Sequence, residues 1–216
     1  MHGTEALVFD FDGVLVESTD VKTQAFATIY REYGADIASK AVEYHLAYAG
    51  VSRLIKFRHL HKVLLGIILS DEETAELGER FSSLVTDAVI AAPWVAGARE
   101  FLESHYRLLP LFVVSGTPDE ELKAIIARRG MQGYFRSVHG SPATKGEIIS
   151  GILQRHQFEP RRVLMIGDSA TDYQGALEAG VRFLALAPAG SKLFPDATSI
   201  LPDLTRLKAF LSEGAS

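Results

Sequence analysis

The chain of 216 residues contains no cysteine, so disulfide bonds and thiolate chemistry are excluded. That absence fits a reducing compartment, in which disulfides are rare. Long apolar runs are also missing, because the most apolar window, residues 63–69, is far too short to span a bilayer. Residues 1–5 lack the basic start and the apolar run of a signal peptide. We therefore expect a cytoplasmic protein that has no membrane partner.

Basic residues are outnumbered, since 22 lysines and arginines stand against 27 aspartates and glutamates, a formal net charge of −5. Proteins that bind nucleic acids present a basic surface to the phosphate backbone, so this balance argues against a nucleic-acid partner. The hydrophobic content of 47% and charged content of 23% are ordinary for a globular protein. The length allows one large domain or a core with a smaller insert.

Residues 18–91 carry helical patterns and no strand pattern, with helices expected over 19–33 and 40–49 and a third behind the capping box at 70–73. From Pro93 onward, helices alternate with strands expected at 111–114, 163–166 and 183–187. Together with a first strand at 7–9, this alternation predicts an α/β fold, a Rossmann-like doubly wound parallel sheet. The predicted domains are a core of residues 1–17 and 92–216 and an inserted all-helical cap of residues 18–91.

Two aspartates one residue apart follow the first predicted strand. Side chains at i and i+2 of an extended segment project the same way, so Asp10 and Asp12 should share one small volume. Two carboxylates at such a short distance repel each other unless a cation binds between them. In open α/β sheets, ligands bind beyond the carboxyl ends of the strands. Gly13 then permits a sharp turn, and the stretch predicts a metal-assisted reaction centre.

The stretch Asp-Phe-Asp-Gly-Val-Leu-Val-Glu-Ser, residues 10–18, resembles the opening motif of the haloacid dehalogenase (HAD) superfamily. It is closest to the branch that contains phosphoglycolate phosphatase, other small-molecule phosphatases and β-phosphoglucomutase. In that family the first aspartate is the nucleophile that takes the phosphoryl group, and the second is the general acid/base. The resemblance implies these roles for Asp10 and Asp12, and it spans residues 7 to about 180.

A hydroxyl residue and a lysine follow in the family's order. Ser115 ends the strand at 111–114, and its hydroxyl and the N–H groups around Gly116 could bind phosphate oxygens. Residues 117–120 have the pattern of a capping box, so we expect Thr117 to cap a helix. Lys145 precedes a helix and would offset the charge of nucleophile and phosphate. The alternative for Lys145 is a solvated surface lysine.

A last acidic pair follows the strand at 163–166. The resemblance makes Asp168 a Mg²⁺ ligand, together with Asp10 and the main-chain carbonyl of Asp12. Magnesium prefers octahedral oxygen coordination with few carboxylates, so this set would suit it. Asp172 has two open readings, because Ser169 and Asp172 also fit a capping box. We expect a shared role, in which Asp172 caps the helix and also lies near the metal site.

Within the insert, Gly50-Val51-Ser52-Arg53 resembles the substrate loop of the β-phosphoglucomutase branch, whose arginine meets a substrate phosphate or another anion. The alternative is a solvated basic face, since Lys56 and Arg58 lie nearby. Lys22 stands where β-phosphoglucomutase has a histidine, and this departure counts against mutase activity. Arg53, Lys22 and Gly116 are thus the substrate-binding candidates.

Taken together, the resemblance implies a Mg²⁺-dependent phosphatase that acts on a small-molecule phosphate monoester, such as a sugar phosphate or sugar-acid phosphate, through an aspartyl-phosphate. Three alternatives stay open: a phosphomutase, a phosphonatase with a Schiff base on Lys22 or Lys56, and a catalytically silent binding protein. Two other activities of the family are disfavoured. A dehalogenase would lack the second aspartate, which is present here as Asp12, and an ion pump would carry Asp-Lys-Thr-Gly after its strand, which is absent. The sequence leaves the particular ester and the oligomeric state open.

Overall fold

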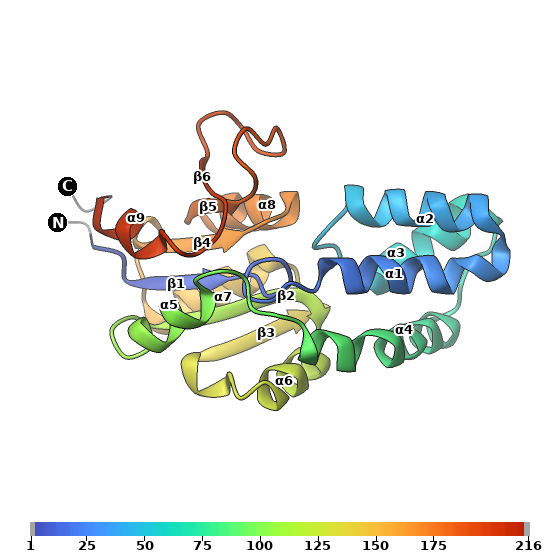
Figure 1. The fold of residues 1–216 in the computed structure, drawn as a ribbon, viewed down its shortest axis with the longest axis horizontal. Coiled ribbons are helices and arrows are strands. Elements are labelled where there is room, and N and C mark those ends of the chain that lie inside the picture. Colours follow the sequence, from blue (N-terminus) through green and yellow to red (C-terminus); the bar gives the residue numbers. More distant parts are fainter. Residues whose placement is uncertain (1–2, 214–216) are drawn as a thin grey trace.

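The structure, a computed structural model, describes residues 3–213. Within them the centre is a parallel six-stranded sheet of order β3-β2-β1-β4-β5-β6 (Figure 1). The strands are β1 (Ala6–Phe9), β2 (Leu111–Pro118), β3 (Ser137–Ser141), β4 (Val163–Gly167), β5 (Arg182–Leu186) and β6 (Ser199–Leu201). The chain runs outward from β1 to β3, then returns to β4 beside β1. The carboxyl ends of β1 and β4 therefore meet at the switch point where such sheets bind ligands.

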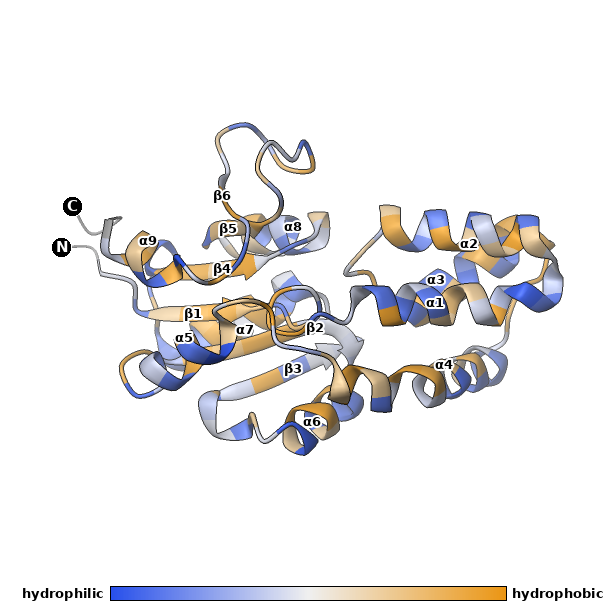
Figure 2. Ribbon diagram, in the orientation of Figure 1, coloured by the Kyte–Doolittle hydropathy of each residue, from blue (hydrophilic) through white to orange (hydrophobic). Residues whose placement is uncertain are grey.

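Alternate side chains of β1 serve two separate apolar clusters, one on each face of the sheet. Leu7 and Phe9 belong to a cluster with residues of α5 (Ala98–His105), α6 (Asp119–Arg128) and α9 (Leu207–Glu213). Ala6 and Val8 belong to a second cluster with α7 (Lys145–His156) and α8 (Ala170–Ala179). Figure 2 shows the hydrophobic strands between these helices. Helices on both faces confirm the doubly wound α/β fold.

The two outermost strands, β3 and β6, were not among the expected strands. β3 reads Ser-Val-His-Gly-Ser and β6 has only three residues, whereas β1 and β4 are buried along their whole length. An edge strand pairs on one side only and lies partly in solvent, so it lacks the continuous apolar run that marks a central strand.

Four α-helices, with a short 3-10 helix (Arg31–Tyr33) and a π-helix (His61–Leu65) between them, make up the insert and lie beyond the carboxyl ends of the strands (Figure 1). The α-helices are α1 (Thr19–Tyr30), α2 (Ala35–Ala47), α3 (Arg53–Leu60) and α4 (Asp71–Ala91). Phe26 is fully enclosed, and its ring centroid lies 5.3 Å from that of Phe57 and 5.1 Å from that of Phe81. These aromatic side chains continue the apolar cluster of Leu7 and Phe9 into the insert, and the four helices confirm its helical character. No helix within residues 3–213 is long and apolar enough to cross a membrane.

The two connections between the insert and the sheet lie side by side. Val16 forms a bridge with Trp94, and Glu17 N–H donates to the carbonyl of Pro93. Beyond α6, Arg129 Nη1 donates to the carbonyls at the end of α4, those of Val89, Ile90 and Ala92, at 2.7–2.8 Å. The Val89 carbonyl also accepts from Ala92 N–H, and the arginine caps the carboxyl end of the helix by bonding all three carbonyls. The division into a core and a cap at residues 17–18 and 91–92 stays a prediction.

Candidate active site

Asp10 continues directly from β1 into the switch point. Its N–H donates to the carbonyl of Ile166 (2.9 Å), which keeps it paired with β4, and its Oδ1 accepts from Phe11 N–H (2.7 Å). The side chain is buried. Gly13 turns the chain with φ +76°, and a Cβ there would lie 2.1 Å from Asp168 Oδ2. Glycine is therefore required at this position for two reasons, the positive φ of the turn and the close approach of the Asp168 side chain.

Carboxylate oxygens of Asp10, Asp168 and Asp172 lie within 4.8 Å of one another. Asp168 follows β4, the neighbour of β1, and Asp172 lies in the first turn of α8. Burial, and then the negative charge of Asp172, raise the pKa of Asp10 to about 7. Burial and the charge of Asp10 raise the pKa of Asp168 well above its usual range. Three such acids fit a hard divalent cation, which would supply the charge that their ionised forms need.

Lys145 is buried, with its Nζ 3.1 Å from Asp10 Oδ2 and in an ion pair with Asp172 Oδ1. The capping box of Thr144 and Glu147 starts α7 here and so places the lysine. Burial alone would lower the pKa of Lys145, but the Asp10 and Asp172 carboxylates outweigh it and raise the pKa. The alternative of a solvated surface lysine is therefore wrong, whereas the catalytic role of Lys145 stays a prediction.

Asp172 divides its two carboxylate oxygens between two tasks. Oδ2 accepts from Ser169 N–H (3.0 Å) and Ser169 Oγ (2.5 Å), which completes the capping box of α8. Oδ1 pairs with Lys145. A Cβ at Gly167 would lie 2.2 Å from the Asp172 Cβ, so only glycine leaves room for this carboxyl. The expected capping is present, and the expected metal role stays a prediction.

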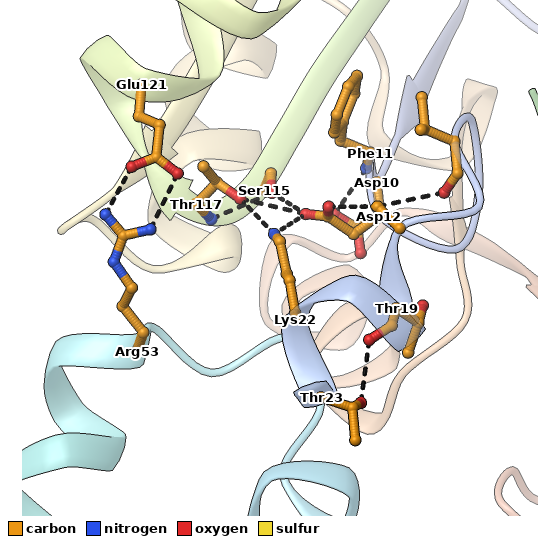
Figure 3. A network of polar contacts seen from close by, with 12 residues as sticks. Asp10, Phe11, Asp12, Thr19, Lys22, Thr23, Arg53, Ser115, Thr117 and Glu121 are labelled. Carbon is orange, nitrogen blue, oxygen red and sulfur yellow. Dashed lines mark hydrogen bonds and ion pairs between the residues drawn. The ribbon is translucent and has the colours of Figure 1, made fainter. Parts of the chain in front are cut away.

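The Asp12 side chain points toward Lys22 of the insert and Thr117 of β2 (Figure 3). Its Oδ2 accepts from Lys22 Nζ (2.5 Å) and Thr117 Oγ1 (3.1 Å), and its Oδ1 accepts from Ser18 Oγ (2.6 Å). Burial tends to raise the pKa of Asp12, but the Lys22 cation and these hydrogen bonds outweigh it and lower the pKa. Any metal contact of Asp12 would therefore come from its main-chain carbonyl, as the resemblance implies.

Thr117 does not cap α6, which corrects the expectation from the sequence. α6 has no side-chain cap, because β2 continues to Pro118 and holds Thr117 in an extended conformation. The Thr117 hydroxyl instead accepts from Lys22 Nζ (2.8 Å) and donates to Asp12. Thr117 stands two residues beyond Ser115 on one strand and hence on the same face. That spacing is the signal that could have identified it.

Ser115 and Gly116 lie where β2 meets the insert. Ser115 Oγ is 3.4 Å from Asp12 Oδ2 and accepts from Thr117 N–H at 3.1 Å (Figure 3). A Cβ at Gly116 would lie 2.4 Å from the Gly50 carbonyl oxygen, so the backbones of core and insert touch here. Their phosphate-binding roles stay predictions.

Arg53, the first residue of α3, is buried and reaches across to α6. Its Nη1 and Nη2 donate to the two carboxylate oxygens of Glu121 at 2.9 and 2.6 Å (Figure 3), and Nη2 also donates to Ser82 Oγ. Burial tends to raise the pKa of Glu121, but the hydrogen bonds and charge of the Arg53 guanidinium outweigh it and lower the pKa. The alternative of a solvated basic face is wrong for Arg53. The structure pairs this arginine with a carboxylate that no sequence motif marks.

A cavity of about 70 Å³ lies between the core and the insert. The core contributes Asp10, Asp12, Ser115 and Asp168 to its walls, whereas the insert contributes both charged and aromatic side chains. Those from the insert include Lys22, Phe26, His45, Arg53, Lys56 and Phe81. The candidate catalytic acids and the candidate substrate-binding residues therefore line one small cavity.

A parallel doubly wound sheet with clustered acids at the carboxyl ends of β1 and β4 and a helical insert above them defines a class of hydrolases. The profile of the haloacid dehalogenase-like hydrolase family matches residues 7–186. The chain therefore belongs to the haloacid dehalogenase-like hydrolases.

Curated relatives agree with this assignment, and solved structures share the fold. The chain is 25% identical to the phosphoglycolate phosphatase of Synechococcus elongatus, over 84% of this chain and 83% of that one. It is 25% identical to the phosphorylated carbohydrates phosphatase of Thermotoga maritima, over 82% of each. A haloacid dehalogenase-like hydrolase of Streptococcus pneumoniae shares the fold with a TM-score of 0.71 at 23% identity, covering 97% and 99% of the two chains. So does a magnesium-bound HAD-hydrolase of Bacillus subtilis, with a TM-score of 0.71 at 17% identity and the same coverage.

Proposed function

We propose that the protein is a Mg²⁺-dependent phosphatase that hydrolyses a small-molecule phosphate monoester through an aspartyl-phosphate on Asp10. A sugar phosphate or sugar-acid phosphate is the expected kind of ester. The proposal rests on one observation, the convergence of Asp10, Asp168 and Asp172 with Lys145 against Asp10. Two curated relatives with known substrate types, phosphoglycolate and phosphorylated carbohydrates, support it.

Asp10, Asp168 and Asp172, with the Asp12 carbonyl, would hold Mg²⁺, which neutralises charge on the transferring phosphoryl group when bound. In the first step an Asp10 carboxylate oxygen bonds to phosphorus. The phosphorus–oxygen bond to the alcohol breaks, and the departing oxygen takes a proton from Asp12. Lys145 holds positive charge beside Asp10, and the Ser115 hydroxyl orients the phosphoryl oxygens.

In the second step Asp12 takes a proton from water, the water oxygen bonds to phosphorus, and the bond between phosphorus and Asp10 breaks. The Lys22 ammonium at 2.5 Å favours the ionised form of Asp12 that this step requires. The first step requires the protonated form, which the negative charge of an incoming phosphate ester favours. The Lys22 cation and the substrate anion thus act on Asp12 in opposite directions, which suits a group that must both donate and accept a proton.

Phosphate release from a panel of monoesters, with Mg²⁺ and with a chelator, tests the proposed function. The panel contains p-nitrophenyl phosphate, glucose 6-phosphate, 2-phosphoglycolate and ethyl phosphate. We expect phosphate release that requires Mg²⁺. Conversion of β-glucose 1-phosphate to glucose 6-phosphate with little free phosphate would favour the phosphomutase instead. No release from any ester would favour the silent binding protein.

The stabilisation by Mg²⁺ should be larger at pH 8 than at pH 6. The pKa of Asp10 rises on folding from 3.8 to about 7, so the metal-free folded state keeps a proton that the unfolded state has lost. Its stability therefore falls as the pH rises from about 4 to about 7. Mg²⁺ needs the ionised carboxylate and competes with that proton less at higher pH.

The measurement is the change in melting temperature on adding Mg²⁺ at each pH. Asp168→Asn should lose the change at both pH values, because it removes one acid of the cluster. Asp196→Asn is the matched control, since Asp196 is exposed and lies outside the cluster. A change at pH 6 as large as at pH 8 would contradict the role of Asp10.

A further inference from the structure

Three cationic side chains from the insert line the cavity, and they differ in what balances their charge. Lys22 pairs with Asp12 at 2.5 Å, and Arg53 pairs with Glu121 at 2.6 Å. Lys56, on α3, is only 2% exposed and has no carboxylate within ion-pair distance among residues 3–213. Its amino group is thus buried against the cavity without an ion pair to any acid of residues 3–213.

The polar contacts of Lys56 come from one residue, His45. The Nζ lies 3.1 Å from His45 Nδ1 and 3.3 Å from the His45 carbonyl oxygen. Burial, and then the Lys56 charge, lower the pKa of His45 to about 3, so its imidazole is neutral and Nδ1 accepts. These two bonds use two of the three ammonium donors. The third has no partner among the described residues, although the side chain lines the cavity.

The surroundings of Lys56 do not favour its charge when the cavity holds no anion. The Phe26 ring, whose centroid lies 5.7 Å from Nζ, attracts the ammonium only weakly and also stacks on the His45 ring at 4.4 Å, so it does not replace an anion. Burial, and then the positive charge of Lys22, lower the pKa of Lys56 to about 7. A buried ammonium is costly unless a negative group enters beside it. The residue is therefore built to gain from an anion in the cavity.

We infer that Lys56 is a specificity-determining residue whose ammonium binds a carboxylate of the substrate, at the end away from the phosphoryl group. The inference rests on the proposed phosphatase function and names its substrate class, a compact phosphate ester that bears a carboxylate. One cation with one unused donor matches a monoanion better than a second phosphate dianion. A cavity of about 70 Å³, which must also admit the phosphoryl group, favours the smaller anion as well.

Steady-state kinetics of Lys56→Met with 2-phosphoglycolate and ethyl phosphate test the inference. The two esters have the same carbon number, and only the first has a carboxylate. We expect KM for 2-phosphoglycolate to rise about 10- to 100-fold, the usual effect of losing a hydrogen bond between charged groups, with a much smaller change in kcat. KM for ethyl phosphate should change far less. Lys62→Met, an exposed lysine in the same insert, is the matched control.

If Lys56 only supported the fold, Lys56→Met would change the kinetics of both esters equally, and that result would overturn the inference. Phosphate release by the wild type would still support the proposed function. Calorimetric binding to Asp10→Asn protein, with and without Lys56→Met, separates the two further. Weaker binding of 2-phosphoglycolate alone in the double variant supports the role of Lys56, whether or not any ester is hydrolysed. Equal binding of 2-phosphoglycolate by the single and double variants would overturn it.

Discussion

Asp10→Asn should lower Mg²⁺-dependent phosphate release by about 10⁴-fold or more, because an amide supplies no anionic oxygen to attack phosphorus. The replacement keeps the shape of the side chain, and its oxygen can still accept from Phe11 N–H. Burial and nearby carboxylates disfavour the charge of Asp10. Without metal, the variant should therefore melt at the same temperature as the wild type or higher, and its loss of activity cannot be attributed to unfolding.

The measurement compares phosphate release and melting temperature for the wild type, Asp10→Asn and the exposed control Asp196→Asn. The control should retain the wild-type rate, since Asp196 lies outside the cavity. Full activity of Asp10→Asn would end the assignment of Asp10 as nucleophile. An Asp10→Asn protein that melts well below the wild type without metal would contradict the account of Asp10 as a buried acid whose charge its surroundings disfavour.

Lys145→Met should reduce both stability and activity. Removal of the ammonium leaves Asp10 and Asp172 without their common cation, and breaking a buried ion pair in this way costs about 3–5 kcal/mol. The loss should be largest near pH 8, because below its raised pKa of about 7 the Asp10 carboxylate takes up a proton and needs the cation less. Phosphate release should also fall about 10²- to 10³-fold, as expected when charge stabilisation of a transition state is lost.

Urea unfolding at pH 8 and pH 5 measures the stability effect, with Lys192→Met as the control at an exposed position. Mg²⁺ should restore part of the stability lost by Lys145→Met, because it supplies positive charge to the same acids. An unfolding free energy within about 1 kcal/mol of the wild type at pH 8 would show that Lys145 does not hold the acid cluster together.

The central strands and the acids that follow them could be predicted because their physical signals are local. β1 and β4 are buried on both faces and hence continuously apolar, and each leads directly into an aspartate. The convergence of Asp10 and Asp168 then follows from the direction of parallel strands. β3 and β6 could not be predicted, since edge strands do not need an apolar run.

Contacts between distant segments were the part that local signals could not supply. Arg53 and Glu121 are 68 positions apart, and although a loop motif marks Arg53, no pattern in the sequence marks Glu121 as its partner. The contact between Lys56 and His45 joins α3 to α2 and likewise depends on how the helices pack. Thr117 fits a local capping pattern, but the strand that contains it extends further and turns its hydroxyl to Asp12.

Gly13 and Gly167 have no functional group, yet each leaves a gap that the carboxyl of another residue fills. The Asp168 side chain occupies the gap at Gly13, and the Asp172 side chain occupies the gap at Gly167. A redesign of this protein that kept every reactive group but added one carbon at either glycine would push an acid out of place. A designer who transfers this site to another protein must therefore reproduce the space beside each glycine as well as the reactive side chains.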